Sequence, residues 1–319
     1  MSTLISIITP CFNEEDNVET CRDEVRRVFR EQLPEYEYEH IFSDNASHDK
    51  TVKKLLAMAQ DDKRVKIIVN ARNLGPFRNT FNALRSASGD AVVVQLAADL
   101  QDPPTIIAEF VRQWKAGYKV VYGVRRKRRE QFWLRGARWL YYRLVSRMAD
   151  IDIPLDAGEF QLIDRSVADR LSMVDDYYPY IRGLIAQCGQ RAIGVDYEWQ
   201  KRRSGKSKNR FYNLIDQAFN GLVSTSNIPM RLSVFVGFTL AAVSIVYALI
   251  QLVINLVFLG TAPDGIATLI VGLFFFGGVQ LFFIGILGEY IAAIHSQVRR
   301  GPVMDDVLRI NFEPPDEES

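Results

Sequence analysis

The sequence predicts an α/β protein, with a mostly parallel, doubly wound sheet followed by a C-terminal pair of membrane-spanning helices. Its first 125 residues alternate short β-branched runs with amphipathic stretches, a pattern typical of such a sheet. Residues 232–260 and 266–288 contain no charged side chain, and about 20 apolar residues suffice to cross a membrane. These two stretches argue against a purely soluble protein, and their small number argues against a channel or carrier of many helices.

The alternation of strands and helices also predicts where a ligand binds. The predicted strands are Leu4–Thr9, Tyr38–Ser43, Val65–Val69, Ala91–Leu96 and Lys119–Tyr122, and the predicted helices lie near 15–32, 49–61, 77–87 and 104–116. Open sheets of this kind bind ligands beyond the carboxyl ends of their strands. The residues that directly follow each strand are therefore the candidate site residues.

Two later stretches have the spacing of amphipathic helices. Residues 131–148 repeat apolar side chains at steps of three or four, with arginines between them, and residues 211–223 carry a second apolar stripe. Either stretch could pack on the sheet, but arginine, tryptophan and tyrosine together favour a membrane surface. Basic clusters favour it too, because residues 125–147 hold nine Lys/Arg and one Glu, and residues 201–210 hold six Lys/Arg and no acid.

The charges that flank the two apolar stretches predict their orientation. Residues 261–265, which separate the stretches, include no Lys or Arg, whereas Arg231 precedes the first stretch and Arg299 and Arg300 follow the second. The positive-inside rule then places both termini and the large N-terminal domain in the cytoplasm. The predicted location is the inner cell membrane, with two passes.

Two common phosphate-binding motifs are absent from the sequence. A dinucleotide fold needs glycines in the turn after the first strand, but that turn reads TPCFNEEDN and the first glycine of the chain is Gly75. Gly205-Lys206-Ser207 resembles the end of a P-loop, which requires a glycine five positions earlier, where the chain has Gln200. Both nucleotide-binding folds are therefore excluded.

Carboxylates occupy the strand ends instead. Asp44 follows the second predicted strand, and Asp99 and Asp102 follow the fourth. Asp102 stands just before two prolines, and we interpret it as the N-cap of the next helix. We interpret Asp99 as the ligand of a divalent cation, because such an ion commonly bridges one or two carboxylates to substrate phosphates.

Six segments, taken in order, resemble a known family. They are 5–15 (ISIITPCFNEE), 42–51 (FSDNASHDKT), 70–75 (NARNLG), 89–104 (GDAVVVQLAADLQDPP), 156–165 (DAGEFQLIDR) and 202–208 (RRSGKSK). Together they resemble the inverting family 2 glycosyltransferases of GT-A fold, and within them the dolichol-phosphate mannose synthase group. The chain is still more similar to the bacterial bactoprenol glucosyltransferases, which carry two C-terminal spans.

The resemblance implies a GT-A domain in two halves and a membrane anchor. Residues 1–130 would form the half that binds the nucleotide sugar, and residues 131–231 the acceptor-side half with amphipathic interfacial helices. Residues 232–295 would form two transmembrane helices, about 232–260 and 266–294, and residues 296–319 a cytoplasmic tail.

The resemblance also implies residues that bind the donor and a metal ion. The nucleotide-sugar residues are Pro10, Phe12, Glu14, Asp44, Ala98, Asp99 and Gln101. The Asp-x-Asp element of the family falls on Ala97-Ala98-Asp99, so its first aspartate is missing. Asp99 would then be the protein ligand of Mg²⁺ or Mn²⁺.

Further residues are implied for catalysis and for the acceptor. The catalytic residues would be Asp99, Asp156, Glu159 and Arg202, and the acceptor-phosphate residues Arg125, Arg128, Arg138, Ser207 and Lys208. Arg125 would contact the lipid phosphate directly, and Arg202 would stabilise the leaving diphosphate. Asp156 and Glu159 would position the sugar or the acceptor or act as a base, unless they merely form a turn.

The resemblance implies that the protein transfers a hexose, namely glucose from UDP-glucose, onto undecaprenyl phosphate with inversion. The product would serve as a sugar donor for cell-envelope glycosylation such as O-antigen modification. The expected partners are a UDP-sugar, a polyprenyl phosphate and an anionic membrane surface, with no nucleic acid. A homo-oligomer such as a tetramer is compatible with a membrane anchor of only two helices.

One alternative function is that of a processive polysaccharide synthase, although the Gln-x-x-Arg-Trp motif of those enzymes is lacking. Another is a catalytically weak membrane scaffold that binds sugar nucleotides, because Ala97 replaces an aspartate.

Overall fold

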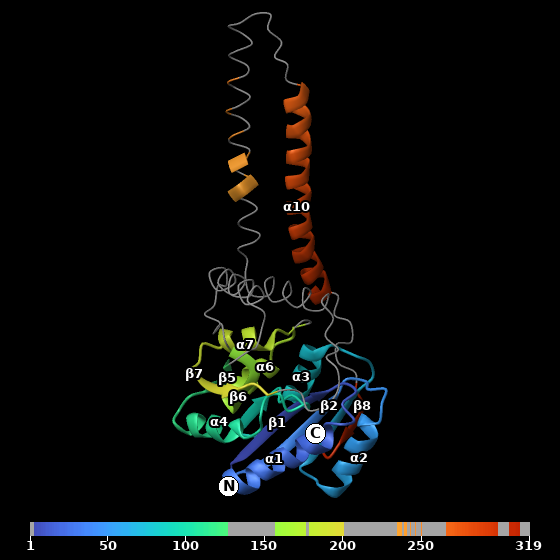
Figure 1. Ribbon diagram of the computed structural model, residues 1–319, viewed down its shortest axis with the longest axis vertical. Coiled ribbons are helices and arrows are strands. Elements are labelled where there is room, and N and C mark those ends of the chain that lie inside the picture. The colour runs from blue at the N-terminus through green and yellow to red at the C-terminus, as the bar shows by residue number, and fades with distance from the viewer. Residues whose placement is uncertain are drawn as a thin grey trace, which may run out of the picture. The chain divides into compact units, whose positions relative to one another are not determined.

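The computed structural model describes residues 3–126, 157–176, 179–200, 266–298 and 306–312, with a few helical positions between 235 and 250 (Figure 1). The chain divides into two compact units. The first comprises Met1–Ser146, Ile151–Gly221 and Arg300–Ser319, and the second comprises Arg147–Asp150 and Leu222–Arg299. The described part of the first unit is an α/β body, and that of the second is chiefly one long helix.

The first unit is built on an eight-stranded sheet with the order β7-β5-β6-β4-β1-β2-β3-β8. Its strands are β1 (Leu4–Cys11), β2 (Glu37–Asp44), β3 (Val65–Asn70), β4 (Ala91–Val94), β5 (Val120–Arg126), β6 (Ala157–Asp164), β7 (Ala192–Glu198) and β8 (Asp306–Ile310). Neighbouring strands run parallel except at β6 and β8, which are antiparallel to the strands beside them. The predicted mostly parallel sheet is confirmed, and all five predicted strands are present; β6, β7 and β8 were not predicted.

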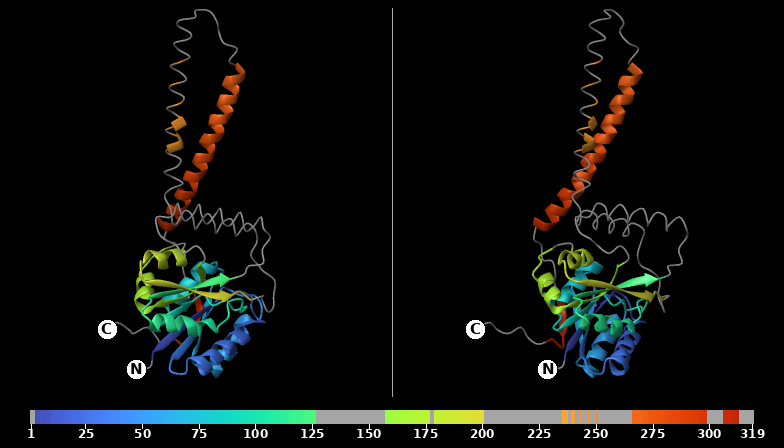
Figure 2. Two further views of the ribbon diagram at one scale, coloured as in Figure 1. Left: turned by 60° about the vertical axis from the view of Figure 1, so that its left-hand side comes forward. Right: turned by 90° about the vertical axis from the view of Figure 1, so that its left-hand side faces the viewer.

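Helices cover both faces of this sheet, as two further views show (Figure 2). On one face lie α1 (Val18–Gln32), α2 (Thr51–Asp61) and α4 (Ile106–Lys115), and on the other lie α3 (Pro76–Arg85), α6 (Arg165–Ser172) and α7 (Ile181–Gln187). Successive strand residues serve opposite faces, since Ile7 belongs to the first core cluster and Ile8 to the second. Strands buried on both sides explain the continuous apolar runs in the sequence.

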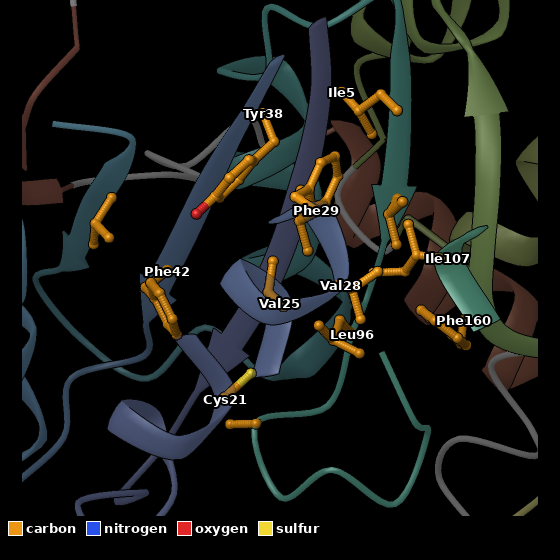
Figure 3. Packing of buried hydrophobic residues seen from close by; sticks show 14 of the residues in the cluster. Ile5, Cys21, Val25, Val28, Phe29, Tyr38, Phe42, Leu96, Ile107 and Phe160 are labelled. Carbon is orange, nitrogen blue, oxygen red and sulfur yellow. The ribbon is translucent and has the colours of Figure 1, made fainter. Parts of the chain in front are cut away.

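The larger core cluster fixes α1 against the strands that lead to the candidate site (Figure 3). Cys21, Val25 and Val28 recur at steps of three or four on α1 and are all buried. Phe29 stacks on Tyr38 of β2, with ring centroids 4.4 Å apart. Burying a side chain of this size stabilises the fold by about 1.5–3 kcal/mol. These contacts therefore fix α1 against the sheet, with the stacked pair at the amino end of β2.

The strand β8 returns the C-terminal segment to the sheet, where it pairs antiparallel with β3. Asn311 anchors its end, because the Asn311 Nδ2 donates to the carbonyls of Ala59 and Val65, each at 2.8 Å. The Arg309 Nη1 donates to the Ser86 Oγ at 3.0 Å. This strand was not predicted, because the contacts that stabilise it are with residues distant in the chain.

The helix α10 (Ile266–Val298) has 33 residues, and its 18-residue window Phe275–Ala292 has a mean hydropathy of 1.6 and is 6% buried. At 1.5 Å per residue it extends about 50 Å, more than the roughly 30 Å of a hydrocarbon core. Within the described ranges it is the one helix long and apolar enough to cross a membrane. The predicted first span, 232–260, lies mostly outside the described residues, and the amphipathic stretches 131–148 and 211–223 lie wholly outside them.

A buried histidine should make the stability of this fold depend on pH. The His40 Nε2 is 2.8 Å from the Thr9 Oγ1, and the His40 Nδ1 is buried with no hydrogen-bond partner in the described ranges. Burial, and then the charge of Arg22, lower the pKa of His40 to about 3. Between pH 3 and about 6.5 the unfolded chain therefore binds a proton that the folded chain does not.

We expect the free energy of unfolding to decrease as the pH falls from about 6.5 toward 3, by at most about 1.4 kcal/mol per pH unit from this residue. His40→Phe should flatten that slope, and His48→Phe, at an exposed position, should not. Hydrogen exchange of β1 and β2 amides in the detergent-solubilised full chain, followed over this pH range, measures the free energy of unfolding and hence the slope. An unchanged slope in His40→Phe would contradict the assignment.

Candidate active site at the carboxyl edge of the sheet

The carboxyl ends of the parallel strands and the amino end of β6 lie at the same edge of the sheet. β6 pairs antiparallel with β4 on one side and with β5 on the other, so β6 begins where those two strands end. The predicted residues at this edge are Pro10, Phe12, Glu14, Asp44, Ala98, Asp99, Gln101, Arg125 and Glu159. The topology thus gathers donor-side and acceptor-side candidates from five separate strands at the edge where α/β sheets bind ligands.

The loops that follow β1 and β2 are locked to each other. Asn13 adopts a left-handed conformation with φ 53°, and its N–H donates to the Ser47 Oγ at 2.8 Å. The Asn13 Oδ1 accepts a hydrogen bond from the His48 N–H, also at 2.8 Å. These bonds fix the backbone that carries Phe12 and Glu14, so the predicted nucleotide loop is preorganised.

Asp44 ends β2 as a fully buried carboxylate. Its Oδ2 accepts a hydrogen bond from the Ser47 N–H at 2.8 Å, whereas its Oδ1 has no hydrogen-bond partner in the described part of the chain. Burial raises the pKa of Asp44, although its hydrogen bonds with Ser47 act in the opposite direction. A buried acceptor without a donor is costly, and it is suited to receive an N–H group from a ligand.

The loop after β4 carries the predicted metal ligand. Gln95 and Leu100 have φ values of 56° and 58°, so the chain turns sharply on either side of Ala97. Asp99 is buried, and its Oδ1 accepts a hydrogen bond from the Gln101 N–H at 3.2 Å. The described residues contain no group of three or more His, Cys, Asp or Glu that could hold a metal ion. Asp99 nevertheless offers a hard oxygen ligand, which suits Mg²⁺ or Mn²⁺ held jointly by a carboxylate, substrate phosphates and water.

The interpretation of Asp102 as a helix N-cap is wrong. The N-cap of α4 is Thr105, which makes no capping hydrogen bond with its side chain. Asp102 instead pairs with Arg125 of β5, with the Arg125 Nη2 2.9 Å from the Asp102 Oδ2, and it accepts a short hydrogen bond from the Tyr197 hydroxyl. The pairing of Asp102 with Arg125 outweighs local capping because a buried carboxylate needs a charged partner.

Arg125 is held on several sides. Its Nε donates to the Asp102 Oδ1 at 3.2 Å and to the Tyr197 hydroxyl at 3.1 Å, and its guanidinium lies 5.4 Å from the centroid of the Trp199 ring. Burial lowers the pKa of Arg125, but the negative charge of Asp102 and the interactions with Tyr197 together outweigh this and raise the pKa overall. The predicted acceptor residue is therefore a fixed, permanently charged group.

Glu159 lies on β6 close to the same arginine. Burial raises the pKa of Glu159, whereas the positive charges of Arg182 and Arg125 lower it. A carboxyl group with a raised pKa beside two cations can position a polar substrate or exchange a proton with it. Glu159 lies within the strand Ala157–Asp164, so the alternative in which it merely forms part of a turn is wrong.

The other predicted site residues, which lie outside the described ranges, are Asp156, Arg128, Arg138, Arg202, Ser207 and Lys208. Sequence reasoning missed Tyr197 and Arg182, which the fold brings to Arg125 and Glu159. No motif marked them, because each acts through a contact with a residue far away in the sequence. An isolated tyrosine in the short strand β7 resembles an ordinary core residue.

Comparisons with known proteins show the family to which the chain belongs. The sequence profile of Glycosyl transferase family 2 matches residues 6–172. The chain is 34% identical over 299 residues to the uncharacterized glycosyltransferase YkcC of Bacillus subtilis, covering 93% of this chain and 91% of that protein. It is 32% identical over 300 residues to the SfII prophage-derived bactoprenol glucosyl transferase of Shigella flexneri, covering 93% of this chain and 96% of that protein.

Solved structures share the fold. The crystal structure of a mycobacterial protein matches with a TM-score of 0.51 and 19% identity, over 69% of this chain and 73% of that one. Glucosyl-3-phosphoglycerate synthase from Mycobacterium tuberculosis, in complex with Mn²⁺, UDP-glucose and phosphoglyceric acid, matches with a TM-score of 0.50 and 17% identity. That match covers 69% of this chain and 78% of that one. At such identities the likeness establishes the fold.

Proposed function

This chain belongs to glycosyltransferase family 2, and from that membership we propose that it transfers a hexose, glucose from UDP-glucose, with inversion onto a polyprenyl phosphate. The bactoprenol glucosyl transferase of Shigella flexneri, which aligns over 93% of this chain, supports the choice of sugar and lipid. One observation carries the proposal. A buried acceptor at Asp44, a carboxylate at Asp99 and a fixed arginine at Arg125 stand at one edge of one sheet.

The donor would bind on the β1, β2 and β4 side of this edge. The free Asp44 Oδ1 would accept a hydrogen bond from the ring N–H of uracil. Asp99 would hold Mg²⁺ or Mn²⁺ together with the diphosphate, as supported by the Mn²⁺ and UDP-glucose bound to the mycobacterial synthase. When bound, such an ion stabilises the negative charge that develops on the leaving diphosphate.

The acceptor would bind on the β5 and β6 side. A phosphate monoester is mostly a dianion near neutral pH, because its second pKa is about 6, so one of its oxygens can attack the anomeric carbon directly. The new carbon–oxygen bond forms as the bond to UDP breaks, and UDP departs with the electron pair. Attack from the side opposite to the leaving group inverts the anomeric centre. Arg125 would orient the attacking phosphate, and Glu159 would orient the sugar or the acceptor.

The connectivity of the sheet supports a two-pass membrane anchor. The chain leaves the sheet after β7 and returns to it at β8, so both strands lie on the same side of any membrane that it crosses. If α10 crosses once, the residues between β7 and α10 must cross an odd number of times. The uncharged stretch 232–260 is long enough to cross once. We accordingly propose a multi-pass protein of the inner membrane, with both termini in the cytoplasm.

Transfer by the purified full-length protein tests the proposed reaction. Radiolabelled sugar nucleotides would be offered one at a time with undecaprenyl phosphate, with and without Mg²⁺ or Mn²⁺. We expect one glucose per lipid, equimolar UDP and a requirement for the metal. Long sugar products that form without the lipid would instead identify a processive synthase, and binding of UDP-glucose without turnover would identify a scaffold.

Cysteine labelling tests the membrane topology. Cys11 and Cys21 are buried, so Cys188→Ser gives a background in which added cysteines are read selectively. We expect Thr261→Cys to react with an impermeant maleimide in intact spheroplasts, because the loop would face outward. Met173→Cys, at a highly exposed position of the α/β unit, should react only after lysis. The reverse pattern would contradict the proposed orientation.

A further inference from the structure

The guanidinium of Arg125 is bound along one edge by Asp102, and no described residue forms a hydrogen bond with its other edge. Its Nε and Nη2 donate to the two carboxylate oxygens of Asp102, at 3.2 and 2.9 Å. A guanidinium has five N–H groups in a planar fork, so this pairing leaves the N–H groups of the opposite edge available. The Arg125 side chain is 22% exposed, while that of Asp102 is 3% exposed. The buried carboxylate thus holds one edge of the guanidinium, the inner edge, and leaves the N–H groups of the other, outer edge available to a ligand.

Tyr197 completes this arrangement from β7. Its hydroxyl accepts a hydrogen bond from the Arg125 Nε at 3.1 Å and donates to the Asp102 Oδ1. The fold leaves room for the ring, because a Cβ on Gly123 would lie 2.6 Å from the Tyr197 Cε1. The edge of the ring also meets Phe160, with centroids 6.1 Å apart. The contacts with Gly123 and Phe160 therefore restrict the position of the Tyr197 ring, and its hydroxyl has little freedom to move.

The same contacts link the loop that carries the metal ligand to the acceptor side. Asp102 lies three residues after Asp99, so its pair with Arg125 ties that loop to β5. One residue earlier, the Gln101 carbonyl accepts a hydrogen bond from the Gln200 N–H at 2.9 Å, beyond the end of β7. Asp102 and Tyr197, which lie on two other elements, thus orient the arginine. In the proposed reaction neither of these two side chains contacts the acceptor phosphate.

We propose that Asp102 and Tyr197 are positioning residues, which orient Arg125 so that its outer edge binds the acceptor phosphate through two parallel hydrogen bonds. This inference rests on the proposed function, in which Arg125 contacts the phosphate of the polyprenyl acceptor. An arginine that is fixed in advance loses less conformational freedom on binding than a mobile one. Bidentate pairing also requires the planar fork of arginine, which lysine lacks.

Tyr197→Phe is the sharpest single test, because it removes one hydroxyl and leaves the ring and every charge in place. We expect the KM for polyprenyl phosphate to rise about tenfold, with the KM for UDP-glucose and the saturated rate within twofold. Tyr122→Phe, on β5, is the matched control and should leave every constant unchanged. Thermal melting of both variants shows whether each remains folded.

A double-substitution cycle separates positioning from a merely structural role. Arg125→Lys keeps the charge that balances the buried Asp102, so the fold should survive, but it removes the fork. We expect Arg125→Lys to raise the acceptor KM at least tenfold, and Tyr197→Phe added to it to change that constant less than twofold. Equal effects of Tyr197→Phe in both backgrounds would contradict the proposal, because the tyrosine would then act independently of Arg125.

Asp102→Asn provides a second route to the same conclusion. It keeps the shape and removes the charge that orients the guanidinium, and we expect the acceptor KM to rise severalfold while the donor KM is unchanged. Asp169→Asn, which removes the exposed partner of Arg165, is its matched control. If Arg125→Lys leaves the acceptor KM unchanged, the assigned role of Arg125 is wrong. If Arg125→Lys raises it but neither Tyr197→Phe nor Asp102→Asn does, only the positioning inference is wrong.

Discussion

Replacement of Asp99 by asparagine is expected to lower the rate of transfer at least a hundredfold. In the proposed site this carboxylate would be the charged oxygen ligand that the loop after β4 offers to a divalent ion, and because it is buried, water would not replace it easily. Loss of one group that stabilises charge in a transition state costs on the order of 3–4 kcal/mol, or two to three decades in rate. The rate at saturating UDP-glucose and lipid, over a range of Mn²⁺ concentrations, is the measurement.

The reverse change at Ala97 tests the same site from the other side. Where the family element has an aspartate this chain has Ala97, so we expect metal affinity to be weak without nucleotide and to rise steeply with it. Ala97→Asp should strengthen Mn²⁺ binding in the absence of nucleotide. It need not accelerate transfer, because tighter binding in the ground state does not lower the barrier.

Electron paramagnetic resonance of Mn²⁺, with and without UDP-glucose, measures both effects. Asp169→Asn, at an exposed position on α6, should bind Mn²⁺ as the unmodified protein does. Tight binding of Mn²⁺ to the unmodified, nucleotide-free protein, or full activity of Asp99→Asn, would place the metal elsewhere.

Replacement of Asp44 is expected to have the second largest effect, on the donor. The Asp44 Oδ1 is buried without a partner among the residues that the structure describes, and a hydrogen bond from uracil to a carboxylate is worth about 1.5–3 kcal/mol. Asp44→Ala should therefore raise the KM for UDP-glucose about 10- to 100-fold. The acceptor KM should not change, because the lipid phosphate binds on the other side of the site in the proposed arrangement.

Asp44→Asn distinguishes recognition of the base from simple loss of shape. The asparagine keeps the size of the side chain, and its one oxygen is needed to accept the Ser47 N–H that Asp44 accepts. Its NH₂ group then takes the place of the Asp44 Oδ1, and this group can only donate, as the ring N–H of uracil does. Cytosine has an acceptor at the same ring position. The variant should therefore bind UDP more weakly than the unmodified protein does, and its affinity for CDP relative to UDP should rise. Inhibition of transfer by each nucleotide gives the two constants. Equal loss for both nucleotides would show that Asp44 supports the pocket without reading the base.

The order of strands and helices in the first 125 residues was determined by the sequence itself. The strands buried on both faces need continuous apolar runs, and the helices that cover them need one apolar stripe each, so both leave a periodic record. The same sequence pattern predicted that Asp44 and Asp99 follow strands. In the fold Asp44 is the last residue of β2, and Asp99 lies in the loop after β4. The long apolar helix α10 could also be predicted from the sequence, because the length and the apolar composition of its uncharged run are sufficient to indicate it.

The tertiary structure alone decided how the two sides of the site are joined. It inserted β6 between β4 and β5, brought β8 back to the edge of the sheet, and replaced the expected cap at Asp102 with a pair to Arg125. The partners Asp102 and Tyr197 are 95 residues apart in sequence. Such contacts leave no local period, because their energy depends on which distant segments meet, and any one of these residues by itself resembles an ordinary turn or core residue. Local pattern therefore determined the elements of the sheet, whereas long-range pairing of buried charges determined the orientation of the arginine at its edge.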